Sequence, residues 1–160
     1  MTLPSLAAVL AKLAAAGIAV PPGRVALDSF GDTPELSREL VALIRAGRKR
    51  AGASLRWAYD HEDEPLPEVG DVGVVVDHEG QPVAVTRVVS VQVVAFDEVD
   101  AAYAALEGEG DGSLAYWRAV HWDVFGRECA RIGRVPAEDM PVVCCAFELV
   151  AVVAGSHRPC

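Results

Sequence analysis

The segment Glu107-Gly-Glu-Gly-Asp-Gly-Ser-Leu-Ala-Tyr-Trp117 alternates carboxylates with glycines and then continues into an apolar helical stripe. Glycine lets the backbone bend tightly, and Asp111 or Ser113 is suited to accept hydrogen bonds from the free N–H groups at the start of a helix. Apolar residues recur at helical spacing from Leu114 to about Ile132. The segment therefore predicts an acidic loop that joins two helices.

Upstream of this loop the apolar residues follow the two-residue period of strands. Candidate strands are Ala53–Tyr59, Asp71–Asp77 and Pro82–Ala95, and a last strand, Val142–Val153, follows the helices. A block of strands with helices inserted at its ends is typical of an α+β fold, here a small curved sheet or barrel, rather than of alternating β-α-β units.

Three further helices are expected, at Pro4–Gly17, at Pro34–Gly47 after a Thr33 cap, and from a cap at Asp97 to about Leu106. Pro21 and Pro22 prevent the first helix from resuming. We therefore expect an N-terminal helical extension over residues 1–28, one domain over residues 29–153 and a tail over residues 154–160.

The composition bounds the kind of protein. The chain has 160 residues, of which 52% are hydrophobic and 23% charged, and this describes one packed domain. No apolar run approaches the roughly 20 residues that a membrane helix needs, and no signal peptide is visible, so a cytoplasmic protein is expected. The net charge of −9 argues against a protein that coats nucleic acid through overall positive charge.

The cysteines show neither a C-x-x-C spacing nor an accompanying pair of histidines. They lie at positions Cys129, Cys144, Cys145 and Cys160. We expect reduced thiols, no zinc or other metal site and no cofactor.

A basic turn follows the second helix, from Arg45 to Arg50. It contains Lys49, one of only two lysines in a chain with twelve arginines. A lysine ammonium can lose its proton when desolvated or can anchor a phosphate, whereas arginine stays charged. The alternatives are a solvated lysine and arginines that only complement the helix C-terminus.

Glu107 falls at the C-terminus of a helix, where the helix dipole disfavours a carboxylate unless a cation is near. The sequence therefore predicts that the acidic loop pairs with the basic turn, and Lys49 is the natural partner. Glu109 and Asp111 precede the next helix, so they also fit as ordinary residues of a helix start. His121 and Trp117 lie on the apolar stripe and fit either a core or a surface that stacks a base.

Five features occur in this order and spacing: Phe30-Gly-Asp-Thr-Pro-Glu-Leu36, Ala46-Gly-Arg-Lys-Arg-Ala-Gly-Ala-Ser-Leu55, the Glu107–Trp117 string, His121 and Asp139-Met-Pro-Val-Val-Cys-Cys-Ala-Phe147. Together they resemble the ASCH domain family over about Phe30 to Val150. This resemblance implies a PUA-like β-barrel with flanking helices and a cleft in which the G-x-K turn faces the acidic loop.

Members of that family are variously proposed to bind RNA, to cleave it, or to hydrolyse N4-acylated cytidine with a lysine, a threonine and a glutamate. The resemblance places the lysine on Lys49 and the glutamate on Glu107, but the threonine position is Gly52. Glycine has no hydroxyl to act as a nucleophile. Ser54 would stand about 6–7 Å further along a strand, so it is only a speculative substitute.

The leading hypothesis is a cleft that binds RNA or a nucleoside-sized ligand, including a modified nucleoside. The alternatives are a hydrolase, either a ribonuclease or an acylcytidine amidohydrolase that uses Lys49 and Glu107, and an inactive module that binds a protein partner. No membrane partner is expected. The predicted ligand-binding residues are Arg48, Lys49, Arg50, Ser54, Glu107, Glu109, Asp111, Trp117 and His121.

Overall fold

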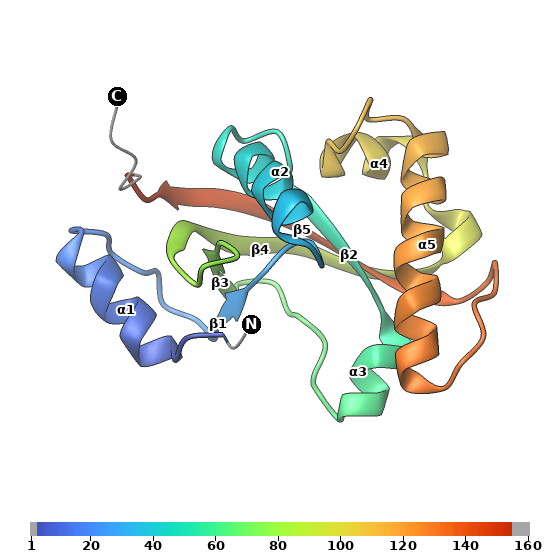
Figure 1. Ribbon diagram of the computed structural model, residues 1–160, viewed down its shortest axis with the longest axis horizontal. Helices are drawn as coiled ribbons and strands as arrows, with labels where there is room; N and C mark the ends of the chain where they lie inside the picture. The colour runs from blue at the N-terminus through green and yellow to red at the C-terminus, as the bar shows by residue number, and fades with distance from the viewer. Residues whose placement is uncertain (1–2, 155–160) are drawn as a thin grey trace.

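A computed structural model describes residues 3–154 and shows a mixed five-stranded sheet with helices around it (Figure 1). The strand order is β1-β3-β4-β5-β2. The first pair, β1 with β3, is parallel, and the other neighbours are antiparallel. The strands are β1 Val25–Asp28, β2 Ala51–Leu55, β3 Val72–Val76, β4 Pro82–Ala95 and β5 Pro141–Val152.

Four of the five α-helices in the described residues begin after a residue whose side chain caps the helix, and α3 is the exception. Thr33 accepts a hydrogen bond from the backbone N–H of Leu36 at 3.1 Å, and Pro34 occupies the first turn. Ser113 does the same for the longest helix, from the N–H of Tyr116 at 3.1 Å. The helices are α1 Leu6–Ala15, α2 Pro34–Arg45, α3 Arg56–Glu62, α4 Ala101–Glu107 and α5 Leu114–Ile132, with a short 3-10 turn, η1, at Phe96–Glu98.

Helices cover both faces of the sheet around β3, and every residue of this strand is buried. Val72 and Val74 pack in one cluster with Val9 and Leu13 of α1. Val75 points to the other face and packs with Ile44 of α2. A third cluster joins α4 and α5 to the far end of the sheet. Because successive strand residues point to opposite faces, the continuous valine run fits a strand that is buried on both sides.

The α+β class is confirmed, whereas the sheet is not closed into a barrel. Strands β1 and β2 form the two edges of the sheet and do not pair with each other in the described part of the chain. The long strands β4 and β5 shift register twice, between Val85 and Thr86 and between Val88 and Ser90. Such bulges bend and twist a sheet locally, and here they curve it without joining its edges.

Two expected elements differ from the observed ones, and two observed elements, α3 and β1, were not expected. The strand expected over residues 53–59 starts at Ala51 and ends at Leu55, which is buried in the core, and the chain then turns into α3. The third helix is capped by Asp100 rather than Asp97, because residues 96–98 form the 3-10 turn. Strand β1 has only four residues and was not expected.

The other expected helices and the last strand are found close to their predicted bounds. The division into an extension, a domain and a tail stays a prediction. Val9 and Leu13 of α1 are fully buried against the sheet, so α1 shares a core with the strands. Residues 155–160 of the expected tail lie outside the described residues.

Candidate functional site

A buried ion cluster joins the basic turn to the acidic loop. The ammonium nitrogen of Lys49 lies 2.9 Å from Oε1 of Glu107 and 2.8 Å from Oε2 of Glu109. It also donates to the backbone carbonyl of Ala51 at 2.7 Å. An ammonium group has three N–H donors, so these contacts use all of them. The side chains of Lys49 and Glu107 are 2% and 1% exposed, and Glu109 is 12% exposed. The predicted pairing of turn and loop is present in this geometry.

Two ring-bearing residues of α5, Trp117 and His121, contact the carboxylate of Glu107. Trp117 donates its indole N–H to Oε2 of Glu107. The His121 ring stacks on Trp117 with centroids 4.2 Å apart, and its Nε2 lies 3.6 Å from the same carboxylate oxygen. Both Glu107 oxygens are therefore occupied by donors from Lys49 and Trp117. Glu109 keeps one oxygen, Oε1, that no donor of the described residues engages.

The backbone fixes the turn against the loop. Arg50 donates its backbone N–H to the carbonyl of Leu106 at 2.8 Å, which ties the turn to the last residues of α4. Gly108 has φ of +64°, and a Cβ there would lie 2.5 Å from the carbonyl oxygen of Arg48. Only glycine allows this conformation together with this close approach. The cluster is therefore held by main-chain contacts as well as by charge.

Burial and charge act in opposite directions on the two carboxyls. Burial raises the pKa of Glu107, and Lys49, His121 and the Trp117 N–H offset this only in part. Burial also acts to raise the pKa of Glu109, which is less enclosed, but Lys49, the neighbouring Glu107 and His121 together outweigh it, so the pKa of that carboxyl is lowered. Glu109 thus carries the firmer negative charge of the pair.

The same cluster includes a set of groups of the kind that binds metals. Donor atoms of Glu107, Glu109 and His121 lie within 4.8 Å of one another. In this arrangement the ammonium group of Lys49 already provides the positive charge between the two carboxylates. A metal ion would have to displace it.

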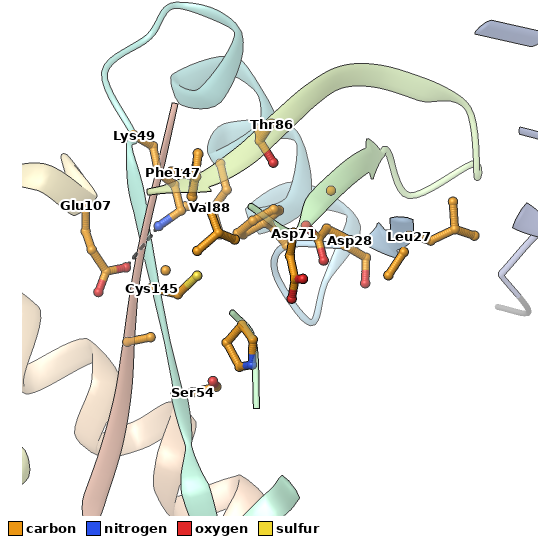
Figure 2. A pocket seen from close by; sticks show the side chains of 18 of the residues that line it. Leu27, Asp28, Lys49, Ser54, Asp71, Thr86, Val88, Glu107, Cys145 and Phe147 are labelled. Carbon is orange, nitrogen blue, oxygen red and sulfur yellow. Dashed lines mark hydrogen bonds and ion pairs between the residues drawn. The ribbon is translucent and has the colours of Figure 1, made fainter. Parts of the chain in front are cut away.

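The cluster forms one end of a cavity of about 800 Å³ between the sheet, α2 and α5. Figure 2 shows Lys49 and Glu107 pointing toward each other on one side, with Asp28 and Asp71 together on the other. Between them the wall carries Cys145 and Phe147, and Phe30 also lines the cavity. Phe30 lies beneath Lys49, with its ring centroid 5.6 Å from the ammonium nitrogen. The cavity is therefore apolar in its middle and charged at both ends.

The second end of the cavity, which we call the Asp28 end, consists of Asp28, Asp71, Arg24 and Thr86. Arg24 donates to both carboxylate oxygens of Asp71, at 2.8 and 2.6 Å, and lowers the pKa of that carboxyl. In contrast, burial together with the neighbouring Asp71 raises the pKa of Asp28 to about 6.

A family model described as the ASCH domain matches residues 26–151, which is most of the chain. The chain belongs to the ASCH domain family. No curated protein matches the sequence.

Two solved structures resemble this ASCH domain protein. The crystal structure of an ASCH domain from Lactobacillus crispatus JV V101 has 35% identity and a TM-score of 0.76, over 79% of this chain and 80% of that one. Protein EF3133 from Enterococcus faecalis V583 has 29% identity and a TM-score of 0.77, over 94% of this chain and 93% of that one. Within the described residues, no helix of this ASCH domain protein is long and apolar enough to cross a membrane.

Several of the residues predicted from the sequence meet at this ASCH cavity. Lys49, Ser54, Glu107, Glu109 and His121 all line it. Ser54 does not approach the ion cluster through its hydroxyl, because Oγ lies 3.0 Å from the hydroxyl oxygen of Tyr59 and makes a hydrogen bond there.

The other predicted residues lie elsewhere. Arg48 and Arg50 are exposed and do not line the cavity. Asp111 is exposed and accepts a hydrogen bond from the backbone of Ser113 at 2.9 Å, as a residue of a helix start would. Trp117 is buried behind Glu107 and outside the cavity lining.

Sequence reasoning missed the Asp28 end. Asp28 and Asp71 lie on or next to strands that pair in parallel, far apart in the sequence, and no local motif marks them. The only available signal was the pair of acidic residues at the boundaries of two apolar segments. Such residues are common at strand ends, so that signal has little specificity.

Proposed function

We propose that this ASCH domain binds a nucleoside-sized ligand, either free or at the end of an RNA strand, in the cavity between the Lys49 turn and the Glu107–Glu109 loop. The observation that carries the proposal is the rigid ion cluster at one end of a cavity of about 800 Å³. Ligand sites in proteins commonly measure roughly 300–1,000 Å³ and combine apolar walls with a few fixed polar groups.

In this proposal Lys49 positions the carboxylates and does not grip the ligand itself. All of its N–H donors are already used within the protein. Glu109 lines the cavity, and its Oε1, which accepts no hydrogen bond within the described residues, can accept from an exocyclic amine of a base or from a ribose hydroxyl. Phe30, Tyr59 and Phe147 provide aromatic surface against which a base can pack.

The exposed Arg48 and Arg50 have a different role in the proposal. They flank Lys49 on the outer side of the turn and do not line the cavity. If the ligand is the end of a strand, these arginines are placed to contact phosphates of the nucleotides outside the cavity. Phosphate contacts of this kind position a strand without reading its sequence.

The test is calorimetric titration of the four common ribonucleosides and of short single-stranded RNAs. We expect Glu109→Gln to weaken binding of every ligand about tenfold, which corresponds to the loss of one charge-assisted hydrogen bond. The matched control is Arg48→Ala, which should leave nucleoside binding unchanged and weaken only RNA binding. Equal affinities of wild type and Glu109→Gln for all ligands would contradict the proposal.

A second candidate function is hydrolysis, because the cavity contains a buried carboxylate, a buried ammonium group and a histidine in contact. Here Glu107 would take a proton from water as the water oxygen bonds to an acyl carbon. Lys49 would stabilise the oxyanion after giving up one of its three present acceptors. Protonated Glu107 would return its proton to the nitrogen as the C–N bond breaks, which gives an acid and an exocyclic amine.

This candidate predicts turnover of N4-acetylcytidine or of RNA that disappears in Glu107→Gln. A covalent acyl-enzyme found by mass spectrometry would contradict the water mechanism. The structure offers that covalent route no evident nucleophile, since position 52 is glycine and the Ser54 hydroxyl is bonded to Tyr59. For this reason we place binding first.

A further inference from the structure

The wall of the cavity is strongly acidic. Two basic side chains, Arg24 and Lys49, line it against six acidic ones. The acidic residues are Asp28, Asp32, Glu64, Asp71, Glu107 and Glu109. Both basic groups are already paired, Lys49 with two carboxylates and Arg24 with Asp71. Asp32 is paired as well, with Arg127 at 2.9 Å. Among the described residues the lining still has more carboxylates than cations paired with them, and it has no unpaired lysine or arginine that could take a phosphate.

Two of these acids, Asp28 and Glu64, have no cation paired with them in the described residues, and only Asp28 is partly buried. It ends strand β1, and its carboxylate lies directly above Gly73 of the neighbouring strand, where a Cβ would come within 2.1 Å of Oδ2. The missing side chain at position 73 thus makes the space that Asp28 occupies. Within residues 3–154, no hydrogen bond or ion pair engages this carboxylate.

The neighbouring Asp71 shows the contrast. Its two oxygens accept from Arg24, and Oδ2 also accepts from the backbone N–H of Glu68 at 2.9 Å. The positive charge of Arg24 is thereby compensated by Asp71. Asp28 lies beside Asp71 in Figure 2 and also lines the cavity, and no cation of the described residues is paired with it.

We propose that Asp28 makes the cavity selective for the charge of its ligand, so that a ligand with an ammonium group binds more tightly than one with a hydroxyl, and a phosphate binds least. The inference rests on the proposed binding function. A buried negative charge interacts with a nearby unit charge far more strongly than in water, because the effective dielectric constant is lower. The Lys49 end has two carboxylates for one ammonium group, so a phosphate finds no better place there.

The experiment uses three forms of adenosine and of cytidine that differ only at the 5′ position. These are the 5′-amino-5′-deoxynucleoside, the nucleoside and the 5′-monophosphate, titrated at pH 7.5. We expect the amino form to bind at least about tenfold more tightly than the nucleoside, and the monophosphate at least about tenfold more weakly. Asp28→Asn should reduce the preference for the amino form to about threefold or less.

The matched control is Asp123→Asn, which removes the same charge from an exposed position on α5 outside this cavity. It should keep the full preference. A monophosphate that binds as well as the nucleoside overturns the inference and leaves the binding function intact. An amino preference that persists in Asp28→Asn overturns the role of Asp28. Failure of every probe to bind wild type overturns the binding function and this inference with it.

Discussion

At the scale of single residues, Lys49 and Lys12 offer a direct comparison because they are the only lysines of the chain. Lys49 is buried between two carboxylates, whereas Lys12 is exposed on α1 and donates to the side chain of Gln81 at 3.0 Å. We expect Lys49→Met to lower the free energy of unfolding by about 3–5 kcal/mol, since it leaves buried carboxylates without their cation. Urea denaturation measures this.

Lys12→Met is the control and should change the stability by less than about 0.5 kcal/mol. A double variant tests whether the uncompensated charge of Glu107 causes the loss of stability in Lys49→Met. Adding Glu107→Gln to Lys49→Met removes the uncompensated buried charge, so it should restore part of the loss. A double variant that is less stable than Lys49→Met would show that the charge of Glu107 is not what the lysine compensates.

The raised pKa of Asp28 predicts that its contribution to the free energy of unfolding falls as the pH rises, which is the reverse of the usual case for a carboxyl group. Burial raises its pKa from 3.8 to about 6 in the folded protein. The folded state therefore holds a proton that the unfolded chain has released, so this group lowers the stability as pH rises from about 4 to about 6. The titratable groups around Asp28 are Asp71, Arg24, Tyr59 and Cys145.

We expect Asp28→Asn to raise the free energy of unfolding by about 1–2 kcal/mol at pH 7 and to have little effect at pH 4, because partial exposure to water weakens the penalty on the charged form. Thermal denaturation at both pH values measures this. The control variant Asp123→Asn should change the free energy of unfolding by the same amount at pH 4 and at pH 7. If Asp28→Asn changes the free energy of unfolding equally at pH 4 and pH 7, ionisation of Asp28 does not destabilise the folded protein. A gain in stability with a loss of ligand selectivity is the signature of a functional residue.

At the scale of elements, the link between the turn and the loop depends on Gly108. Both Gly108 and Gly112 have positive φ, +64° and +76°, but only at Gly108 would a Cβ collide with backbone, 2.5 Å from the Arg48 carbonyl oxygen. Alanine at either position costs roughly 1 kcal/mol for the backbone conformation. We expect Gly108→Ala to cost clearly more than Gly112→Ala and to weaken nucleoside binding, because the loop must move away from Lys49.

Chemical denaturation and titration of the two variants provide the comparison. Similar losses of stability and of nucleoside affinity in both variants would mean that the close approach at Gly108 does not contribute to either.

The elements also show how far sequence reasoning reaches. The pairing of Lys49 with Glu107 was predictable because a carboxylate at the end of a helix requires a cation. The start of the third helix was predicted three residues too early, because Asp97 and Asp100 can both cap a helix. The packing of Phe96 in the core decides between them. The short β1 and the Asp28 end were not predictable, because a four-residue strand has no period and its parallel partner is distant in the chain.

At the scale of the whole molecule, the question is whether α1 is an appended helix or part of the domain. Leu13 is fully buried in one cluster with Val72, Val74 and Val85, whereas Leu106 on α4 is 42% exposed. We expect Leu13→Ala to lower the free energy of unfolding by about 2–5 kcal/mol, in a single cooperative transition. Leu106→Ala, as the control, should cost less than about 1 kcal/mol.

The shape of the unfolding transition separates the two descriptions of α1. If α1 is integral, Leu13→Ala shifts the whole transition, and tryptophan fluorescence reports the same midpoint as circular dichroism, because all three tryptophans lie in or beside the core around α5. If α1 is an extension that melts alone, the fluorescence transition stays at the wild-type midpoint while helix signal is lost earlier. The buried valines of β3 favour the first outcome, since removal of α1 would expose one apolar face of the sheet to water.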